Sequence, residues 1–270
     1  MNEIHERNRR RWNHDSEGWK TLRDRDGLWR RCPEEPGLAF EGQALQFIRD
    51  RAGDLAGKDV CVIGSGDNYA AFALAGLGAK VTSTDISENQ LEVASERAEE
   101  LGLDMMFLRA DAAGLRPLPD SSFDLVCSTN GFLVWISDVV AVCQAVHRVL
   151  RPGGHYVFYD IHPFQRPWKE QVHPIEMVKP YSDTGPYEDD EEGSCEHNWT
   201  LADLLNPLVG SGLVLRQISE DPPDNYRFWE GHAYCDGKDG SLTDWRVNPR
   251  AGLPVWLTVA VQKPRRDSTG

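Results

Sequence analysis

Long hydrophobic runs are missing from this sequence of 270 residues. No apolar stretch approaches the roughly 20 residues that a membrane-spanning helix needs, and the partly basic start of the chain lacks the apolar core of a secretory signal. Positive charge is also scarce, because 29 Lys and Arg stand against 43 Asp and Glu, a net charge of −14. This balance argues against a nucleic-acid backbone or an anionic membrane as the main partner. We therefore expect a cytoplasmic protein that binds neither.

Paired cysteines are absent as well. No two cysteines have the close spacing of a zinc site or a redox motif, so we expect reduced thiols and no metal. The six cysteines are Cys32, Cys61, Cys127, Cys143, Cys195 and Cys235. Internal repeats are also missing, and the acidic run at 188–192 is typical of a solvated loop.

What the sequence does contain is a regular alternation of strand and helix patterns. Five short apolar runs suit buried parallel strands, and they lie at 60–63, 80–84, 105–109, 123–128 and 155–159. Between them, Ser87 begins a capping box and Asp138 is placed to cap a helix with an apolar stripe. Such alternation predicts an α/β protein with a Rossmann-like, doubly wound sheet and right-handed crossovers.

The last third of the chain follows a different pattern. Residues 165–198 are rich in proline, acids and aromatics without a clear period, which indicates an insert on the substrate side. Two later segments, 213–218 and 255–262, alternate as strands. We therefore expect a helical cap region at 1–54 and one domain over 55–270 that carries the insert.

A glycine turn follows the first predicted strand. Gly64-Ser65-Gly66 lets the backbone approach a ligand closely, and the next helix offers free N–H groups. Asp85 ends the second strand, where a carboxylate can accept both hydroxyls of a ribose. Dinucleotide binding needs a third glycine at the position of Tyr69. The pattern therefore predicts a ligand with an adenosine but no pyrophosphate.

Two later segments narrow the class of protein. Asp111 follows the third strand, where its carboxylate and the Ala112 N–H can receive the amine and a ring nitrogen of adenine. The stretch HRVLRPGGHYVFYD supplies a helix, a glycine turn and a fifth strand. With these features the chain resembles the class I S-adenosylmethionine-dependent methyltransferases, in particular the bacterial small-molecule type, over about residues 55–162. The resemblance implies a seven-stranded, mostly parallel sheet whose last strand, 255–262, is antiparallel.

The resemblance also implies a site for S-adenosyl-L-methionine. By position, the cofactor-binding residues are Gly64, Ser65 and Gly66 beside the methionine part, Asp85 at the ribose, Ile86, Asp111 and Ala112 at the adenine, and Asn130 and Gly131 between the methionine part and the substrate. In the N-terminal helix, Trp12 and Trp19 are similar to aromatics that close over the cofactor in this family, and packing of the helix onto the core is an equal alternative for them.

Two positions depart from the family pattern. Val62 stands where the family commonly has an acid, so the ammonium of the methionine part would rely on Asp67 or a backbone carbonyl. Asn68 replaces the last glycine of the turn, and asparagine tolerates the left-handed backbone conformation that such a turn needs. Two alternatives therefore stay open: a weakly active or inactive methyltransferase-like binding module, and a nicotinamide-dependent oxidoreductase, which Tyr69 disfavours.

The predicted reaction is methyl transfer to a small organic acceptor by in-line attack on the sulfonium methyl. A general base is needed only if the accepting atom carries a proton of high pKa. His162, after the fifth strand, is the best-placed catalytic candidate, although a structural role ahead of Pro163 is favoured over a catalytic one; His173 and His197 are weaker candidates. Aromatics in the last third favour a small molecule over a macromolecule. O-, N- and C-methylation remain open, and we expect a monomer or a homodimer.

Overall fold

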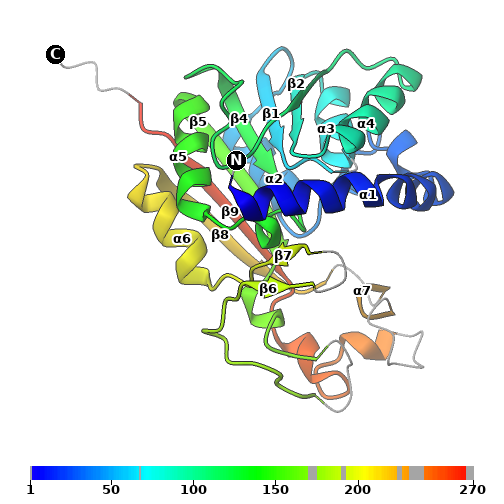
Figure 1. Cartoon of the computed structure of the whole chain (residues 1–270), viewed down its shortest axis with the longest axis vertical. Helices are drawn as coiled ribbons and strands as arrows, with labels where there is room; N and C mark the ends of the chain where they lie inside the picture. The colour runs from blue at the N-terminus through cyan, green and yellow to red at the C-terminus, as the bar shows by residue number, and fades with distance from the viewer. Residues whose placement is uncertain are drawn as a thin grey trace.

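A single mixed sheet with helices on both faces organises the protein (Figure 1). The computed structural model describes residues 2–66, 68–169, 175–189, 193–223, 227–230 and 240–265. Asp67, His173 and Cys235, each named in the sequence-based predictions, lie outside the described residues.

Seven strands form the main sheet. In chain order they are β1 (Asp59–Ile63), β2 (Lys80–Asp85), β3 (Met106–Arg109), β4 (Phe123–Ser128), β5 (Leu150–Ile161), β8 (Val214–Asp221) and β9 (Trp256–Gln262). Their spatial order is β3-β2-β1-β4-β5-β9-β8. The first five run parallel, whereas β9 is antiparallel to both neighbours, β5 and β8. This arrangement confirms the predicted fold, including its antiparallel last strand.

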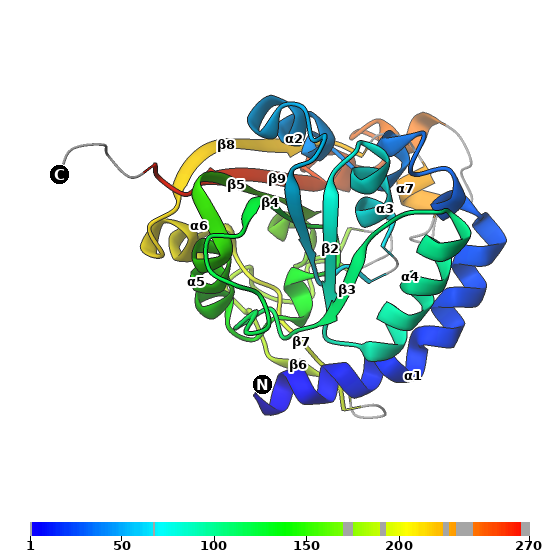
Figure 2. The same ribbon diagram turned by 90° about the horizontal axis from the view of Figure 1, so that it is seen from above.

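Helices cover both faces of this sheet, as Figure 2 shows from above. They are α1 (Glu3–Asp26), α2 (Ala44–Ala52), α3 (Tyr69–Gly76), α4 (Glu88–Glu100), α5 (Val139–Val149), α6 (Leu201–Gly210) and α7 (Arg227–Glu230). Local capping sets several starts: Ser87 Oγ accepts from Gln90 N, and Asp138 accepts from Ala141 N. Both predicted caps are confirmed.

The core is divided by the sheet into two apolar layers. Along β1, Val62 packs into the layer beneath α2 and α3, whereas Cys61 and Ile63 pack into the layer that includes α5 and α6. This alternation follows from the period of two in a strand. As a result, the side chain of Val62, at the position of the family acid, is buried in the core.

Helix α1 lies across the carboxyl ends of the parallel strands. His5 bonds Asp111 after β3, Asn13 Oδ1 accepts from Ser87 after β2, and Asn8 Nδ2 donates to the carbonyl of Trp135 after β4. Since ligands of open α/β sheets bind at this edge, α1 is placed to cover a site there.

The described parts of the insert contain a short hairpin that the aperiodic sequence did not predict. Strands β6 (Tyr187–Glu188) and β7 (Cys195–Glu196) pair antiparallel. Asn8 of α1 holds this hairpin, because its side chain donates to the carbonyl of Cys195 and accepts from the Cys195 N–H. The five described cysteines are buried and free. Within the described residues, no helix is long and apolar enough to cross a membrane.

Candidate functional site

The turn between β1 and α3 folds as a compact left-handed loop. Gly64, Gly66 and Asn68 have φ values of 56°, 51° and 66°, which confirms that asparagine supports the turn at the position of the missing glycine. Asn68 Nδ2 donates to the Gly66 carbonyl at 2.6 Å, and its Oδ1 accepts from Ser83 Oγ. Ser65 faces back toward β2, with its Oγ 2.7 Å from Ser83 Oγ. The turn is therefore preformed.

Asp85 ties this turn to the end of β2. Its Oδ2 accepts from Gly66 N and its Oδ1 from Ser87 N, each at 2.9 Å, and the residue is 7% exposed. Burial raises the pKa of Asp85, against the opposing effect of the backbone N–H donors. Each carboxylate oxygen has a second acceptor position. The carboxylate therefore retains acceptor capacity beyond these two hydrogen bonds.

An aromatic ring covers the first glycine of the turn. A Cβ placed on Gly64 would stand 2.1 Å from Cδ2 of Phe132, the residue that follows Asn130 and Gly131 after β4. Asn130 itself is exposed. Sequence reasoning missed Phe132, and its place directly after the predicted pair is the signal that could have suggested it.

Asp111 is held by the N-terminal helix. Its Oδ1 lies 2.9 Å from His5 Nδ1 and also accepts from Ala113 N at 3.0 Å. His5 Nε2 accepts from Ser137 N at 3.1 Å, so Nδ1 carries the proton and donates it to Asp111. Burial is the largest single influence and would raise the pKa of Asp111, but the lowering effects of His5 and of the Ala113 N–H together outweigh it, and the pKa lies below its ordinary value. Oδ2 has no hydrogen-bond partner in the described part of the chain.

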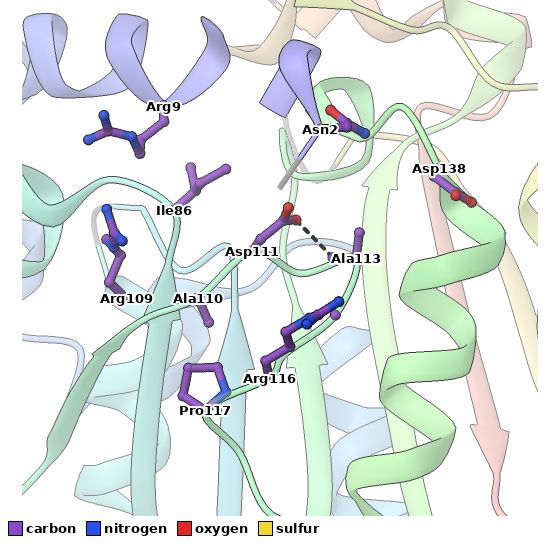
Figure 3. A pocket seen from close by; sticks show the side chains of 11 residues that line it. Asn2, Arg9, Ile86, Arg109, Ala110, Asp111, Ala113, Arg116, Pro117 and Asp138 are labelled. Carbon is purple, nitrogen blue, oxygen red and sulfur yellow. Dashed lines mark hydrogen bonds between the residues drawn. The ribbon is translucent and has the colours of Figure 1, made fainter. Parts of the chain in front are cut away.

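A cavity of about 310 Å³ opens beside this carboxylate. Figure 3 shows Asp111 near its centre, with Ile86 and Arg9 on one side and Arg116 on the other. The cavity is thus lined by two of the predicted adenine-binding residues, Ile86 and Asp111, and the third, Ala112, is buried next to them. The glycine turn does not line it.

The two predicted tryptophans of α1 lie together at the same edge. Trp12 and Trp19 have ring centroids 6.2 Å apart, and Trp12 meets Trp135, after β4, edge-on at 5.3 Å. Arg23 stacks its guanidinium over Trp19 at 5.1 Å. These contacts attach α1 to the loop after β4. A role for the two rings in closing over a cofactor stays a prediction.

His162 is enclosed by the protein. It is 0% exposed, its Nε2 lies 2.7 Å from Glu220 Oε1, and its Nδ1 accepts from Phe164 N at 3.1 Å. Burial lowers the pKa of His162, although Glu220 opposes this shift. Both ring nitrogens are therefore engaged. The base role stays a prediction, and this geometry favours the structural alternative.

Asp160, near the end of β5, is a buried carboxylate that the sequence analysis did not single out. It is 3% exposed and accepts from the backbone N–H groups of Gly131 (3.3 Å), Leu133 (3.2 Å) and Ile161 (2.7 Å). Arg166 Nη2 lies 3.7 Å away. Burial raises the pKa of Asp160, opposed by Arg166 and these donors. A lone acid inside an apolar strand was the available signal.

Together, the sheet order, the glycine turn and the carboxylates at two neighbouring strand ends are an arrangement typical of nucleoside-binding α/β proteins. Residues 61–158 match a family model described as a methyltransferase domain. A demethylmenaquinone methyltransferase from Thermus thermophilus is 36% identical over 120 residues, 44% of this chain and 51% of that protein. A ubiquinone biosynthesis O-methyltransferase from Proteus mirabilis is 27% identical over 124 residues, 46% of this chain and 50% of that protein.

The chain thus spans about half the length of the curated relatives it matches. Among solved structures, an S-adenosylmethionine-dependent methyltransferase from Mesorhizobium loti superposes with a TM-score of 0.60 at 24% identity, covering 82% of this chain and 98% of that one. This likeness concerns the fold. The chain therefore shares its fold with S-adenosylmethionine-dependent methyltransferases, and residues 61–158 resemble a methyltransferase domain.

Proposed function

We propose that this protein transfers a methyl group from S-adenosyl-L-methionine to a small organic acceptor. The observation that carries the proposal is the cavity of about 310 Å³ at Ile86 and Asp111, one strand away from a buried Asp85 that already organises the glycine turn. A cavity of this size with a few convergent polar groups is typical of a small-molecule site.

The nucleoside would be held by groups that still have capacity for hydrogen bonds. The second acceptor positions of Asp85 suit the ribose hydroxyls, and Asp111 Oδ2 suits the exocyclic amine of adenine. The Ala112 N–H suits a ring nitrogen, with Ile86 against the base. Since these groups demand no pyrophosphate, they favour this cofactor over a dinucleotide.

Gly64, Ser65 and Gly66, with Asn130 and Gly131, would surround the methionine part. The bound cofactor supplies a sulfonium methyl that is already an activated electrophile. The protein's own contribution is to align the acceptor in line and to exclude water. Trp12 and Trp19, half-buried on α1 over this edge, would serve the second purpose.

The insert at 165–198 would cover the acceptor. Its described parts are fixed to the site from two sides: Arg7 of α1 bonds Glu188 at 2.8 Å, and His197 N donates to the carbonyl of Val134 at 2.7 Å. Of the curated relatives named above, one is named for ubiquinone biosynthesis and the other for demethylmenaquinone, which supports a small organic acceptor over a macromolecule.

Calorimetric titration with S-adenosylhomocysteine, S-adenosylmethionine and NAD tests the proposal. Binding of the first two without NAD is the expected result, followed by transfer of labelled methyl to a panel of phenols, amines and thiols. NAD binding alone would support an oxidoreductase instead. Nucleoside binding without transfer to any acceptor would support the inactive module.

A further inference from the structure

The buried carboxylate of Asp160 holds the loop that follows β4 from both sides of Phe132. Its Oδ1 accepts from Gly131 N at 3.3 Å, and its Oδ2 accepts from Leu133 N at 3.2 Å. The side chain is 4% exposed, and Arg166 Nη2 lies 3.7 Å from Oδ1. Because a buried charge is costly unless its hydrogen bonds are made, the loop cannot move away without leaving this carboxylate poorly bonded. Asp160 therefore fixes the loop from the end of β5.

The ring of Phe132, between the two anchored positions, rests on the glycine turn. Its Cδ2 lies 2.1 Å from the place where a Cβ on Gly64 would stand. Gly131 has a φ of 84°, a left-handed conformation that glycine adopts without strain and that turns the chain toward this contact. Since β4 lies between β1 and β5 in the sheet, the position of Asp160 sets how the loop after β4 meets the turn after β1.

A second buried carboxylate organises the facing segment. Asp85 accepts from Gly66 N in the turn, as Asp160 accepts from Gly131 N in the loop. The side chain of Val62 is buried in the core, so this position offers no carboxylate to the ammonium group of a bound methionine part. Recognition of that part then depends more on backbone groups of the turn and the loop, and their placement matters more.

We propose that Asp160 is a positioning residue for the methionine part of the cofactor and acts through the backbone of Gly131 and Leu133. The inference rests on the proposed function, which places the methionine part between the glycine turn and this loop. Asp160 itself touches neither cofactor nor acceptor. The proposed ribose and adenine groups, Asp85 and Asp111, follow β2 and β3, on the other side of β1 from β5. Their contacts are therefore independent of Asp160.

The test compares S-adenosylhomocysteine with 5′-methylthioadenosine, which keeps the nucleoside and the sulfur but lacks the amino-acid part. Asp160→Asn turns an NH₂ group against one of the N–H donors. By calorimetry, this variant should bind S-adenosylhomocysteine about tenfold more weakly than the parent, because one hydrogen bond to a charged group is lost. Its affinity for 5′-methylthioadenosine should be nearly unchanged. Equal weakening of both ligands, or of neither, would overturn the inference.

The matched control is Asp124→Asn at the amino end of β4. Asp124 also accepts a backbone N–H, from Asp59, and also pairs with an arginine, Arg151. This variant loses the same kind of bond far from the proposed site, so the ratio of the two affinities should equal that of the parent. A changed ratio in Asp124→Asn would mean that general loss of stability produces the effect, and would likewise overturn the inference.

A measurement on the parent keeps the test open if Asp160→Asn does not fold. Labels of ¹³C on phenylalanine carbonyls and ¹⁵N on leucine select the Phe–Leu peptide bonds, which end at Leu108 and Leu133. Leu108→Ile assigns the two amide signals. S-adenosylhomocysteine should shift the Leu133 signal much more than 5′-methylthioadenosine does, whereas Leu108, in β3 before the proposed adenine site, should respond alike to both.

The outcomes separate this inference from the proposed function. If the parent binds both ligands but Leu133 responds alike to them, the nucleoside site stands and the positioning role of Asp160 is wrong. If the parent binds neither S-adenosylhomocysteine nor S-adenosylmethionine, the proposed function fails and this inference fails with it.

Discussion

Replacing Asp85 tests the ribose site and the glycine turn at once. Both carboxylate oxygens already accept a backbone N–H at 2.9 Å, from Gly66 and Ser87. Asp85→Ala removes both acceptors and the proposed ribose contacts. Asp85→Asn keeps one oxygen, but its NH₂ group must then face one of the two N–H donors. The asparagine variant should therefore be harmful too, which the sequence alone would not suggest.

The size of each effect follows from the hydrogen bonds that each substitution removes. Hydrogen bonds to charged groups contribute about 1.5–3 kcal/mol each, so Asp85→Ala should weaken S-adenosylhomocysteine binding by roughly 2–3 kcal/mol, or roughly 30- to 150-fold. Asp85→Asn should cost about half of that in binding. Both should also lower the free energy of unfolding by about 1–3 kcal/mol, because a buried N–H group is left without its acceptor.

Calorimetry and urea unfolding separate the two effects. A matched control is Asp124→Asn at the amino end of β4, where the carboxylate accepts from Asp59 N at 3.0 Å and pairs with Arg151. That variant should lose stability but bind S-adenosylhomocysteine like the parent. The ribose assignment is wrong if both Asp85 variants bind like the parent, and the turn argument is wrong if neither loses stability.

Three further predictions concern the histidines. Burial lowers the pKa of His155 to about 4 from 6.5, so the unfolded chain binds more protons between these values and stability falls as the pH drops through them; urea unfolding of His155→Gln should show a smaller fall. His5→Ala removes the bond to Asp111, and amide hydrogen exchange across α1 should speed up; unchanged exchange would mean that this bond does not hold α1 in place. His162→Gln should lower the melting temperature with turnover nearly kept, whereas a hundredfold loss of turnover with intact cofactor affinity would support a base.

The sheet was predictable because its signals are local. Short apolar runs, a capping serine at 87 and a capping aspartate at 138 each act within a few residues, and the structure has all of them. The start of β5 was not predictable in the same way, since a Pro-Gly-Gly stretch such as 152–154 is typical of a helix end. This stretch does lie just after the end of α5 at Val149. However, β5 already begins at Leu150, and its pairing with β4 shifts register between Phe123 and Leu125.

The site was only partly predictable, because its remaining contacts join distant parts of the chain. Asp85 and Asp111 could be placed from the strand ends that they follow. The bond from His5 to Asp111 joins residues 106 positions apart in the sequence, and no periodic pattern predicts it. The hydrogen bond between His162 Nε2 and Glu220 joins residues 58 positions apart. It leaves this ring nitrogen with a partner, which the sequence around His162 does not indicate. Such pairings depend on how the elements pack.

The contact between Gly64 and Phe132 yields the last prediction. A methyl group at Gly64 would stand 2.1 Å from the ring, and the residue has φ 56°; Gly66, with φ 51°, has nothing within 4 Å of the same position. Gly66→Ala should therefore show only the cost of a left-handed backbone, about 1–2 kcal/mol.

Gly64→Ala should lose that amount and about 1–3 kcal/mol more from overpacking. In urea unfolding, Phe132→Ala in the same chain should remove the excess but not the backbone cost, so the double variant should be coupled by about 1–3 kcal/mol. Equal losses at Gly64 and Gly66 without coupling would mean that the ring does not rest on the turn. Because the proposed methionine part runs along this turn, the same ring must shift when the cofactor binds, and Phe132→Ala should then speed up association of S-adenosylhomocysteine in stopped-flow measurements.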